Sequence, residues 1–222
     1  MKNIWAVIPA YNEEKNITRV IRNTKKYVDA VVVVDDGSKD ITSKAAEKAG
    51  AVVLRHVVNL GKGAALKTGC DYAIKNADLI IVLDADAQHK PEDIPRFVEK
   101  LRKYDIVFSY RKSSKQMPFV LRFGNNIISK FVYLLYNVDL NDTQSGFRAF
   151  SREAYKKIRW SSTDYSMESE MIARTGKQRL KYVQVPIQTI YSDKYKGTTV
   201  LDGMKIVLNM VWWRLLNGYN RD

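Results

Sequence analysis

The chain has 222 residues, 45% of them hydrophobic, and is long enough to bury a large core without disulfides or a structural metal. Its single cysteine, Cys70, excludes an intrachain disulfide and is compatible with a reducing cytosol, and we expect it to fill the core. Lysine and arginine exceed aspartate and glutamate by 37 to 24, which gives a net charge of +13 and indicates anionic partners.

Three kinds of anionic partner would explain this charge: nucleic acid, an anionic membrane face, or a phosphorylated substrate. The sequence has no zinc-finger spacing and no aromatic RNA-binding signature, so we do not expect nucleic acid binding. The N-terminus becomes acidic before a signal-peptide core forms, and no apolar run approaches the roughly 20 residues of a membrane-spanning helix. We therefore expect a cytoplasmic protein.

Short apolar runs predict strands that alternate with helical patterns through the first half of the chain. Helices are expected from the turn after residue 13 to about residue 27, over 41–49, from the loop 59–63 to about residue 75, and from Pro91 onward. This alternation indicates a parallel sheet with right-handed crossovers. The expected strands are 3–9, 30–34, 51–56, 79–83 and 105–110.

The alternation stops after residue 111. Apolar residues at three-to-four-residue steps predict a long amphipathic helix over 117–138, and the segment 206–216 is apolar and rich in tryptophan but too short to span a bilayer. We predict one α/β domain over 1–222, with a mostly parallel central sheet flanked by helices and a C-terminal amphipathic helix. The other elements expected here are strands 146–150 and 182–187 and helices 151–158 and 167–174.

Carboxylates follow three of the predicted strands at the point where each strand ends. Asp84, Asp86 and Gln88 come directly after a strand that reads as buried on both faces. The carboxyl ends of parallel strands share one edge of a sheet, so these oxygens are expected to meet there and to suit a hard cation such as Mg²⁺ or Mn²⁺. The other acids expected at this edge are Glu13, Asp35 and Asp36.

Four motifs resemble, in order and spacing, the nucleotide-sugar half of family-two glycosyltransferases of the GT-A fold. Within that family the likeness is closest to the polyprenyl-phosphate sugar synthases, of which dolichyl-phosphate mannose synthase is an example, through the segments 142–150 and 185–187. The four motifs are VIPAYNEE at 7–14, VVDDGSKD at 33–40, NLGKGAALKTG at 59–69 and LDADAQH at 83–89.

The resemblance implies transfer of a sugar, expected to be mannose or glucose, from GDP-mannose or UDP-glucose to the phosphate of a polyprenol such as dolichyl phosphate. It implies inversion at the anomeric carbon and a need for Mg²⁺ or Mn²⁺. Two other hypotheses stay open: a glycosyltransferase with a soluble saccharide or protein acceptor, and a non-enzymatic basic α/β module that binds anionic membranes or nucleic acid.

The resemblance also implies roles for individual residues. Asp86 and Gln88 are the expected direct metal ligands, with Asp84 binding the metal through water or touching the ribose, and Asp84, Asp86 and Asp142 are the expected catalytic residues. From its charge alone, Lys62 has two open interpretations: it contacts a phosphate, or it is a solvated loop lysine. The full expected nucleotide-sugar site is Pro9, Tyr11, Asn12, Glu13, Asp36, Lys62, Asp84, Ala85, Asp86 and Glu170.

An acceptor phosphate is already an anion at neutral pH, so it needs positive charge for positioning rather than a strong base. The resemblance implies that Arg111 and Arg122 bind it, with a surface arginine as the alternative for each. The full set expected at the acceptor phosphate is Arg111, Arg122, Asn126, Lys194 and Lys196. The segment 188–200 has lysines where mannose-transferring relatives tend to carry an arginine, which leaves the donor sugar open.

Several other residues have competing interpretations. Arg148, in the same motif as Asp142, is interpreted as a structural residue. Glu170 is expected near the sugar, with a helix-surface position as the alternative. His56 and His89 are expected to be hydrogen-bonded structural residues. Trp212, Trp213 and their neighbours predict peripheral contact with the cytoplasmic face of a membrane, while the alternatives are core packing or a homodimer interface.

Overall fold

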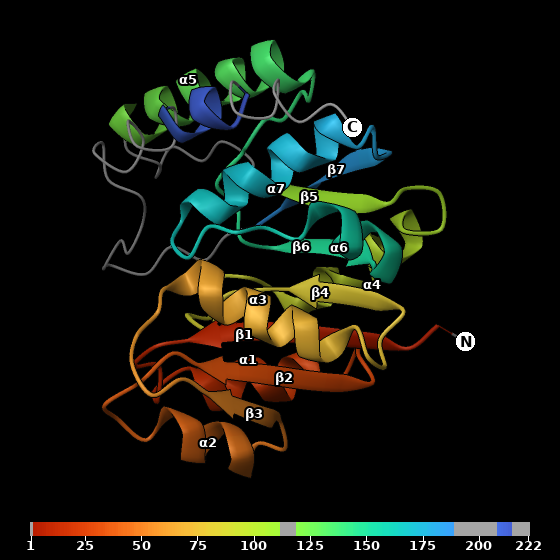
Figure 1. Ribbon diagram of the computed structural model, residues 1–222. Coiled ribbons are helices and arrows are strands. Elements are labelled where there is room, and N and C mark those ends of the chain that lie inside the picture. The colour runs from red at the N-terminus through yellow and green to blue at the C-terminus, as the bar shows by residue number, and fades with distance from the viewer. Residues whose placement is uncertain (1, 112–118, 189–207, 215–222) are drawn as a thin grey trace.

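The computed structural model describes residues 2–111, 119–188 and 208–214, except for the side chains of 119–127. Its centre is a single sheet with helices on both faces (Figure 1). The strand order is β3-β2-β1-β4-β6-β5-β7, and β6 is antiparallel to both of its neighbours while the other pairs are parallel. The mostly parallel α/β sheet predicted from the sequence is therefore confirmed. The strands are β1 Ile4–Ala10, β2 Ala30–Asp35, β3 Val52–Arg55, β4 Leu79–Val82, β5 Ile106–Arg111, β6 Arg148–Ser151 and β7 Tyr182–Ile187.

Alternate residues of the central strands enter two separate cores, one on each face of the sheet. Val7, Val32 and Ile80 pack with Cys70 and Tyr155 in one core. The adjacent residues along the same strands face the other core, beneath the helices on the opposite side. Burial on both faces explains why these strands read as unbroken apolar runs, and the buried Cys70 confirms its predicted place in the core.

The helices follow the predicted pattern with small differences at their ends. The first ends at Thr24 rather than near residue 27, because the chain tightens there: the Tyr27 backbone N–H bonds Thr24 O at 3.0 Å, three residues back instead of four. Pro91 begins a short 3₁₀ turn that leads into α4. The helices are α1 Ile17–Thr24, α2 Thr42–Lys48, α3 Lys62–Ala73, α4 Ile94–Lys100, α5 Phe119–Tyr136, α6 Arg152–Ile158 and α7 Ser166–Lys177.

The helical segment 208–214 lies alongside α5 at one end of the molecule (Figure 1). The Tyr136 hydroxyl donates a hydrogen bond of 2.6 Å to the backbone oxygen of Met210, whose side chain is buried. Large apolar side chains on the outside of this pair remain exposed, among them Leu134, Leu208 and Trp212. Within the described ranges, no helix combines the length and hydrophobicity that crossing a bilayer requires.

Candidate active site

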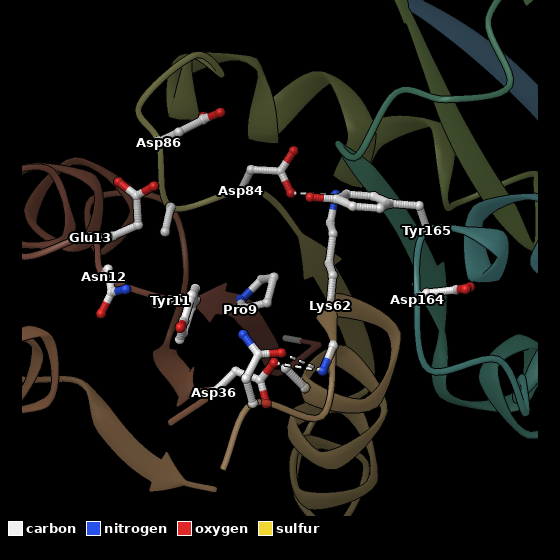
Figure 2. Close-up of a pocket in the computed structure, with 15 residues that line it drawn as sticks. Pro9, Tyr11, Asn12, Glu13, Asp36, Lys62, Asp84, Asp86, Asp164 and Tyr165 are labelled. Carbon is white, nitrogen blue, oxygen red and sulfur yellow. Dashed lines mark hydrogen bonds and ion pairs between the residues drawn. The ribbon is translucent and has the colours of Figure 1, made fainter. Parts of the chain in front are cut away.

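A cavity of about 560 Å³ opens at the carboxyl edge of the sheet, between the ends of β1, β2 and β4 and the segment before α7 (Figure 2). Its volume is in the range of small-molecule sites. Nine of the ten residues expected to bind the nucleotide sugar line it, and only Glu170 does not. We call this cavity the crevice. Its lining residues are Pro9, Ala10, Tyr11, Asn12, Glu13, Asp36, Asn59, Gly61, Lys62, Ala65, Asp84, Ala85, Asp86, Asp164 and Tyr165.

The Asp84 carboxylate is held from two sides. Lys62 Nζ lies 2.8 Å from one of its oxygens, and His89 Nε2 donates to the other at 3.1 Å. Burial by itself would raise the pKa of Asp84, but the Lys62 ammonium and the His89 hydrogen bond hold it well below its usual value. Asp84 is therefore a fixed anion, and His89 is the hydrogen-bonded residue that we predicted.

The Asp86 carboxylate is less constrained. One oxygen accepts a 3.0 Å hydrogen bond from the backbone N–H of Gln88, across a turn in which Ala87 has a left-handed φ of 62°. Burial, and then the negative charge of Asp84, raise the pKa of Asp86. The side chain of Gln88 is not among those that line the crevice. The protein itself thus compensates a negative charge on Asp86 less well than one on Asp84.

This donor set fits a hard divalent cation. The described residues bring no three carboxylate, imidazole or thiol groups together as a complete metal site. Mg²⁺ and Mn²⁺ commonly bind through one or two carboxylates and complete their coordination with water and substrate phosphates. Asp86, with its raised pKa and its position on the crevice wall, is a group that a cation would stabilise, whereas Asp84 already has two positively polarised partners.

The acids after β2 have different surroundings. Asp36 lines the crevice and accepts hydrogen bonds from His56 Nδ1 at 2.7 Å and from the backbone N–H groups of Leu60 and Gly61 at 3.0 and 2.8 Å. It therefore anchors the loop before α3, and His56 has the structural role that we predicted. Asp35 does not reach the crevice, contrary to our expectation, because its buried carboxylate bonds Ser38 N and Ser43 Oγ.

The two glutamates of α7 point to different neighbours. Glu168, which sequence reasoning missed, lies 3.0 Å from Lys62 Nζ. Glu170 is only 4% exposed, so the helix-surface interpretation is wrong; its carboxylate accepts hydrogen bonds from the backbone of Ser161 and Ser162 and from Arg174. Residues two apart on a helix face in nearly opposite directions, and the sequence alone does not show which one contacts Lys62.

Asp164 and Tyr165 also line the crevice, and sequence reasoning missed them. They lie in the polar connection between α6 and α7, and no local pattern marks that segment as part of a site. It reaches the crevice because its backbone pairs with the start of α3: the Ala64 N–H donates to Thr163 O at 3.1 Å. These contacts are thus a product of tertiary structure.

The residues expected to bind the acceptor are described only in part. Arg111 and Asp142 form a two-pronged ion pair, with Nε–Oδ2 at 2.6 Å and Nη2–Oδ1 at 3.1 Å, and neither lines the crevice. The side chains of Arg122 and Asn126, and the residues Lys194 and Lys196, lie outside the described part of the chain. Arg148 is buried and bonds the backbone oxygens of Thr143, Ser145 and Glu168, which confirms its structural interpretation.

The fold and the acidic crevice together define an α/β protein of the GT-A class of nucleotide-sugar transferases. Residues 5–159 match the family model described as glycosyl transferase family 2, and the chain belongs to that family. It is therefore a glycosyltransferase. The structure of glucosyl-3-phosphoglycerate synthase from Mycobacterium tuberculosis, in complex with Mn²⁺, UDP and its product, has the same fold, with a TM-score of 0.72 and 24% identity over 97% of this chain and 79% of that one.

Three relatives match most of this chain. An uncharacterised protein of Methanocaldococcus jannaschii is 41% identical over 96% of this chain and 92% of its own length. A UDP-N-acetylglucosamine–dolichyl-phosphate N-acetylglucosaminyltransferase of Methanococcus voltae is 33% identical over 96% of this chain and 97% of its own. A dolichyl-phosphate beta-glucosyltransferase of Trichomonas vaginalis is 30% identical over 86% of this chain and 67% of its own.

Proposed function

We propose that this enzyme transfers a sugar from a nucleoside-diphosphate sugar to the phosphate of a polyprenol. One observation carries the proposal: of the three relatives described above, the two whose names state an activity differ in the sugar that they transfer but share dolichyl phosphate as acceptor. The relative from Methanococcus voltae matches nearly the whole of both chains, so the likeness includes the second half, where the acceptor residues are expected.

The crevice supplies what the donor side of such a reaction needs. Pro9, Tyr11 and Glu13 would line the base pocket, and Asp36 and Lys62 would flank the nucleoside and the diphosphate. Asp86, with Gln88 and a more distant Asp84, would hold Mg²⁺ or Mn²⁺, and the structural neighbour described above is itself a complex with Mn²⁺. A cation there offsets the negative charge that grows on the departing diphosphate.

The acceptor phosphate needs no general base, since it is already ionised. The chain's task on that side is to position an anion beside the donor, and Arg111 is the described residue that we assign to it. Its guanidinium is paired with Asp142, so the side chain would hold one fixed orientation toward the phosphate. Asp142 then acts as a positioning residue.

A transfer assay tests this proposal. The protein is incubated with Mn²⁺, dolichyl phosphate and radiolabelled GDP-mannose, UDP-glucose or UDP-N-acetylglucosamine in turn, and label is counted after extraction into organic solvent. We expect lipid-linked label with one of these donors and none without dolichyl phosphate. Label that stays in the aqueous phase as a new saccharide would favour a soluble acceptor, and absence of product with every donor would contradict the proposal.

A polyprenyl acceptor places the enzyme at a membrane, and we propose that the exposed surface of α5 and 208–214 rests on the cytoplasmic face. Leu134, Leu208 and Trp212 are 78%, 69% and 59% exposed, and Arg214 lies on the same helical segment as Trp212. Apolar side chains beside a basic residue are suited to a lipid headgroup boundary.

Replacing Trp212 by serine should weaken binding to vesicles that contain anionic lipid by about tenfold to a hundredfold, since one fully buried aromatic side chain contributes about 1.5–3 kcal/mol. Sedimentation with the vesicles measures this. Val57→Ser is the matched control, because Val57 is 98% exposed but lies beyond β3, at the opposite edge of the sheet. Equal binding by both variants, or loss of a dimer on substitution of Trp212, would contradict membrane contact through this surface.

A further inference from the structure

Lys62 lies within the crevice as an ion shared between two carboxylates. Its Nζ is 2.8 Å from Asp84 Oδ1 and 3.0 Å from Glu168 Oε1, and its side chain is 18% exposed. Figure 2 shows the side chain running from the start of α3 toward Asp84. Burial by itself would lower the pKa of the ammonium, but the two carboxylates hold it well above its usual value. Lys62 is therefore a permanent cation.

The backbone that carries Lys62 has little freedom to move away. The Trp160 indole N–H donates to Gly63 O at 2.9 Å, and a Cβ added at Gly63 would lie 2.5 Å from Ser162 O. The glycines on either side of Lys62 thus let the segment before α7 pack directly against the start of α3. Because the backbone is fixed, only the end of the Lys62 side chain is able to change partners.

Among the described residues that line the crevice, acidic side chains outnumber basic ones. Five acids line it, namely Glu13, Asp36, Asp84, Asp86 and Asp164, and among the described lining residues Lys62 is the only lysine or arginine. Glu168 has a second oxygen that is buried and has no hydrogen-bond partner among the described residues. Such an oxygen is costly to bury, and the Lys62 ammonium offsets the charge of Glu168 together with the buried Arg148 guanidinium.

We propose that Lys62 is a built-in counter-ion that opposes metal binding while the crevice is empty and favours nucleotide binding once a diphosphate arrives. In the empty crevice the Lys62 ammonium forms an ion pair with Asp84 and repels a metal ion near Asp86. A bound diphosphate offers the ammonium new oxygens, so Lys62 then adds to the affinity for nucleotide. The metal and the nucleotide would therefore enter together more readily than the metal alone. This proposal rests on the proposed function only for the presence of a diphosphate donor.

The proposal predicts opposite changes in two affinities when the charge is removed. Lys62→Met should bind Mn²⁺ alone roughly tenfold more tightly, because a unit positive charge a few ångströms from a divalent ion costs at least that much at a protein-like dielectric. The same variant, with Mn²⁺ saturating, should bind UDP or GDP roughly tenfold to a hundredfold more weakly, the usual range for losing one charged hydrogen bond. A purely structural lysine would not change the two affinities in opposite directions.

Calorimetric titrations measure both affinities with Mn²⁺ alone and with UDP and GDP as probes. Lys67→Met is the matched control: it removes the same charge from the same helix, and Lys67 does not line the crevice. Lys62→Gln keeps a hydrogen-bond donor beside Asp84 and Glu168 and replaces the methionine variant if that one fails to fold. Lys62→Arg retains the charge and should stay close to the native protein in Mn²⁺ affinity.

Tighter Mn²⁺ binding and weaker nucleotide binding by Lys62→Met, with Lys67→Met unchanged, is the expected result. Unchanged, weaker or undetectable Mn²⁺ binding by the variant, or unchanged nucleotide affinity, overturns the proposal. Neither titration involves an acceptor lipid. Failure of lipid transfer together with the expected pair of affinity changes would therefore refute the proposed acceptor while leaving the role of Lys62 intact.

Discussion

Asp86→Asn is expected to lower kcat/KM for sugar transfer about a thousandfold or more without unfolding the protein. An amide oxygen carries no net charge and binds a divalent cation weakly, so the charge that develops on the leaving diphosphate is no longer offset. That offset is worth several kcal/mol, and each 1.4 kcal/mol or so corresponds to a factor of ten in rate. Initial rates at saturating Mn²⁺ and varied donor concentration measure the change.

The same substitution should leave the thermal unfolding temperature of the metal-free protein equal or higher at neutral pH. The folded state raises the pKa of Asp86 by burial and by the charge of Asp84, so the ionised carboxylate opposes folding above its unfolded-state pKa. Removing the charge removes that opposition. Glu92→Gln is the control, because Glu92 is an exposed acid of the same connection and does not line the crevice. Near-native turnover by Asp86→Asn would refute the metal site.

Arg148→Met is expected to destabilise the fold by about 3–5 kcal/mol, the cost of breaking a buried charged network by removing one partner. Arg148 is 1% exposed, and its guanidinium donates to the backbone oxygens of Thr143, Ser145 and Glu168. It thereby ties the segment before β6 to α7. Methionine fills part of the volume but leaves three carbonyl groups without their donor.

Thermal unfolding should show this loss as a decrease of roughly 6–20 °C, since about 2–4 °C corresponds to each kcal/mol for a chain of this size. Arg148→Lys should recover little, because an ammonium cannot reproduce the planar fork. Arg159→Met serves as the control: its pair with Asp71 is about half exposed, and such surface pairs contribute about 1 kcal/mol or less. An unfolding temperature for Arg148→Met within two degrees of the native value would contradict the structural role.

The donor side of the site was predictable because it is encoded locally. Apolar runs in the sequence indicate buried strands, and the residue that follows such a run lies at the end of the strand. Once alternation with helices implies parallel pairing, Glu13, Asp36, Asp84 and Asp86 are brought to one edge by topology alone. Nothing in that inference required knowledge of how a side chain is oriented.

Orientation and long-range contact were decided only by the tertiary structure. Asp35 and Asp36 are adjacent in sequence, yet one bonds the turn after β2 and the other faces the crevice. Glu168 rather than Glu170 meets Lys62 because packing of α7 selects which of its faces turns toward α3. The sequence by itself thus determined the strands, the parallel pairing of β1 to β4 and the acids at their ends, since those depend on short-range pattern. The three-dimensional packing decided which carboxylates share the Lys62 ammonium. Lys62 and Glu168 are more than one hundred positions apart in the sequence, and only the fold brings them together.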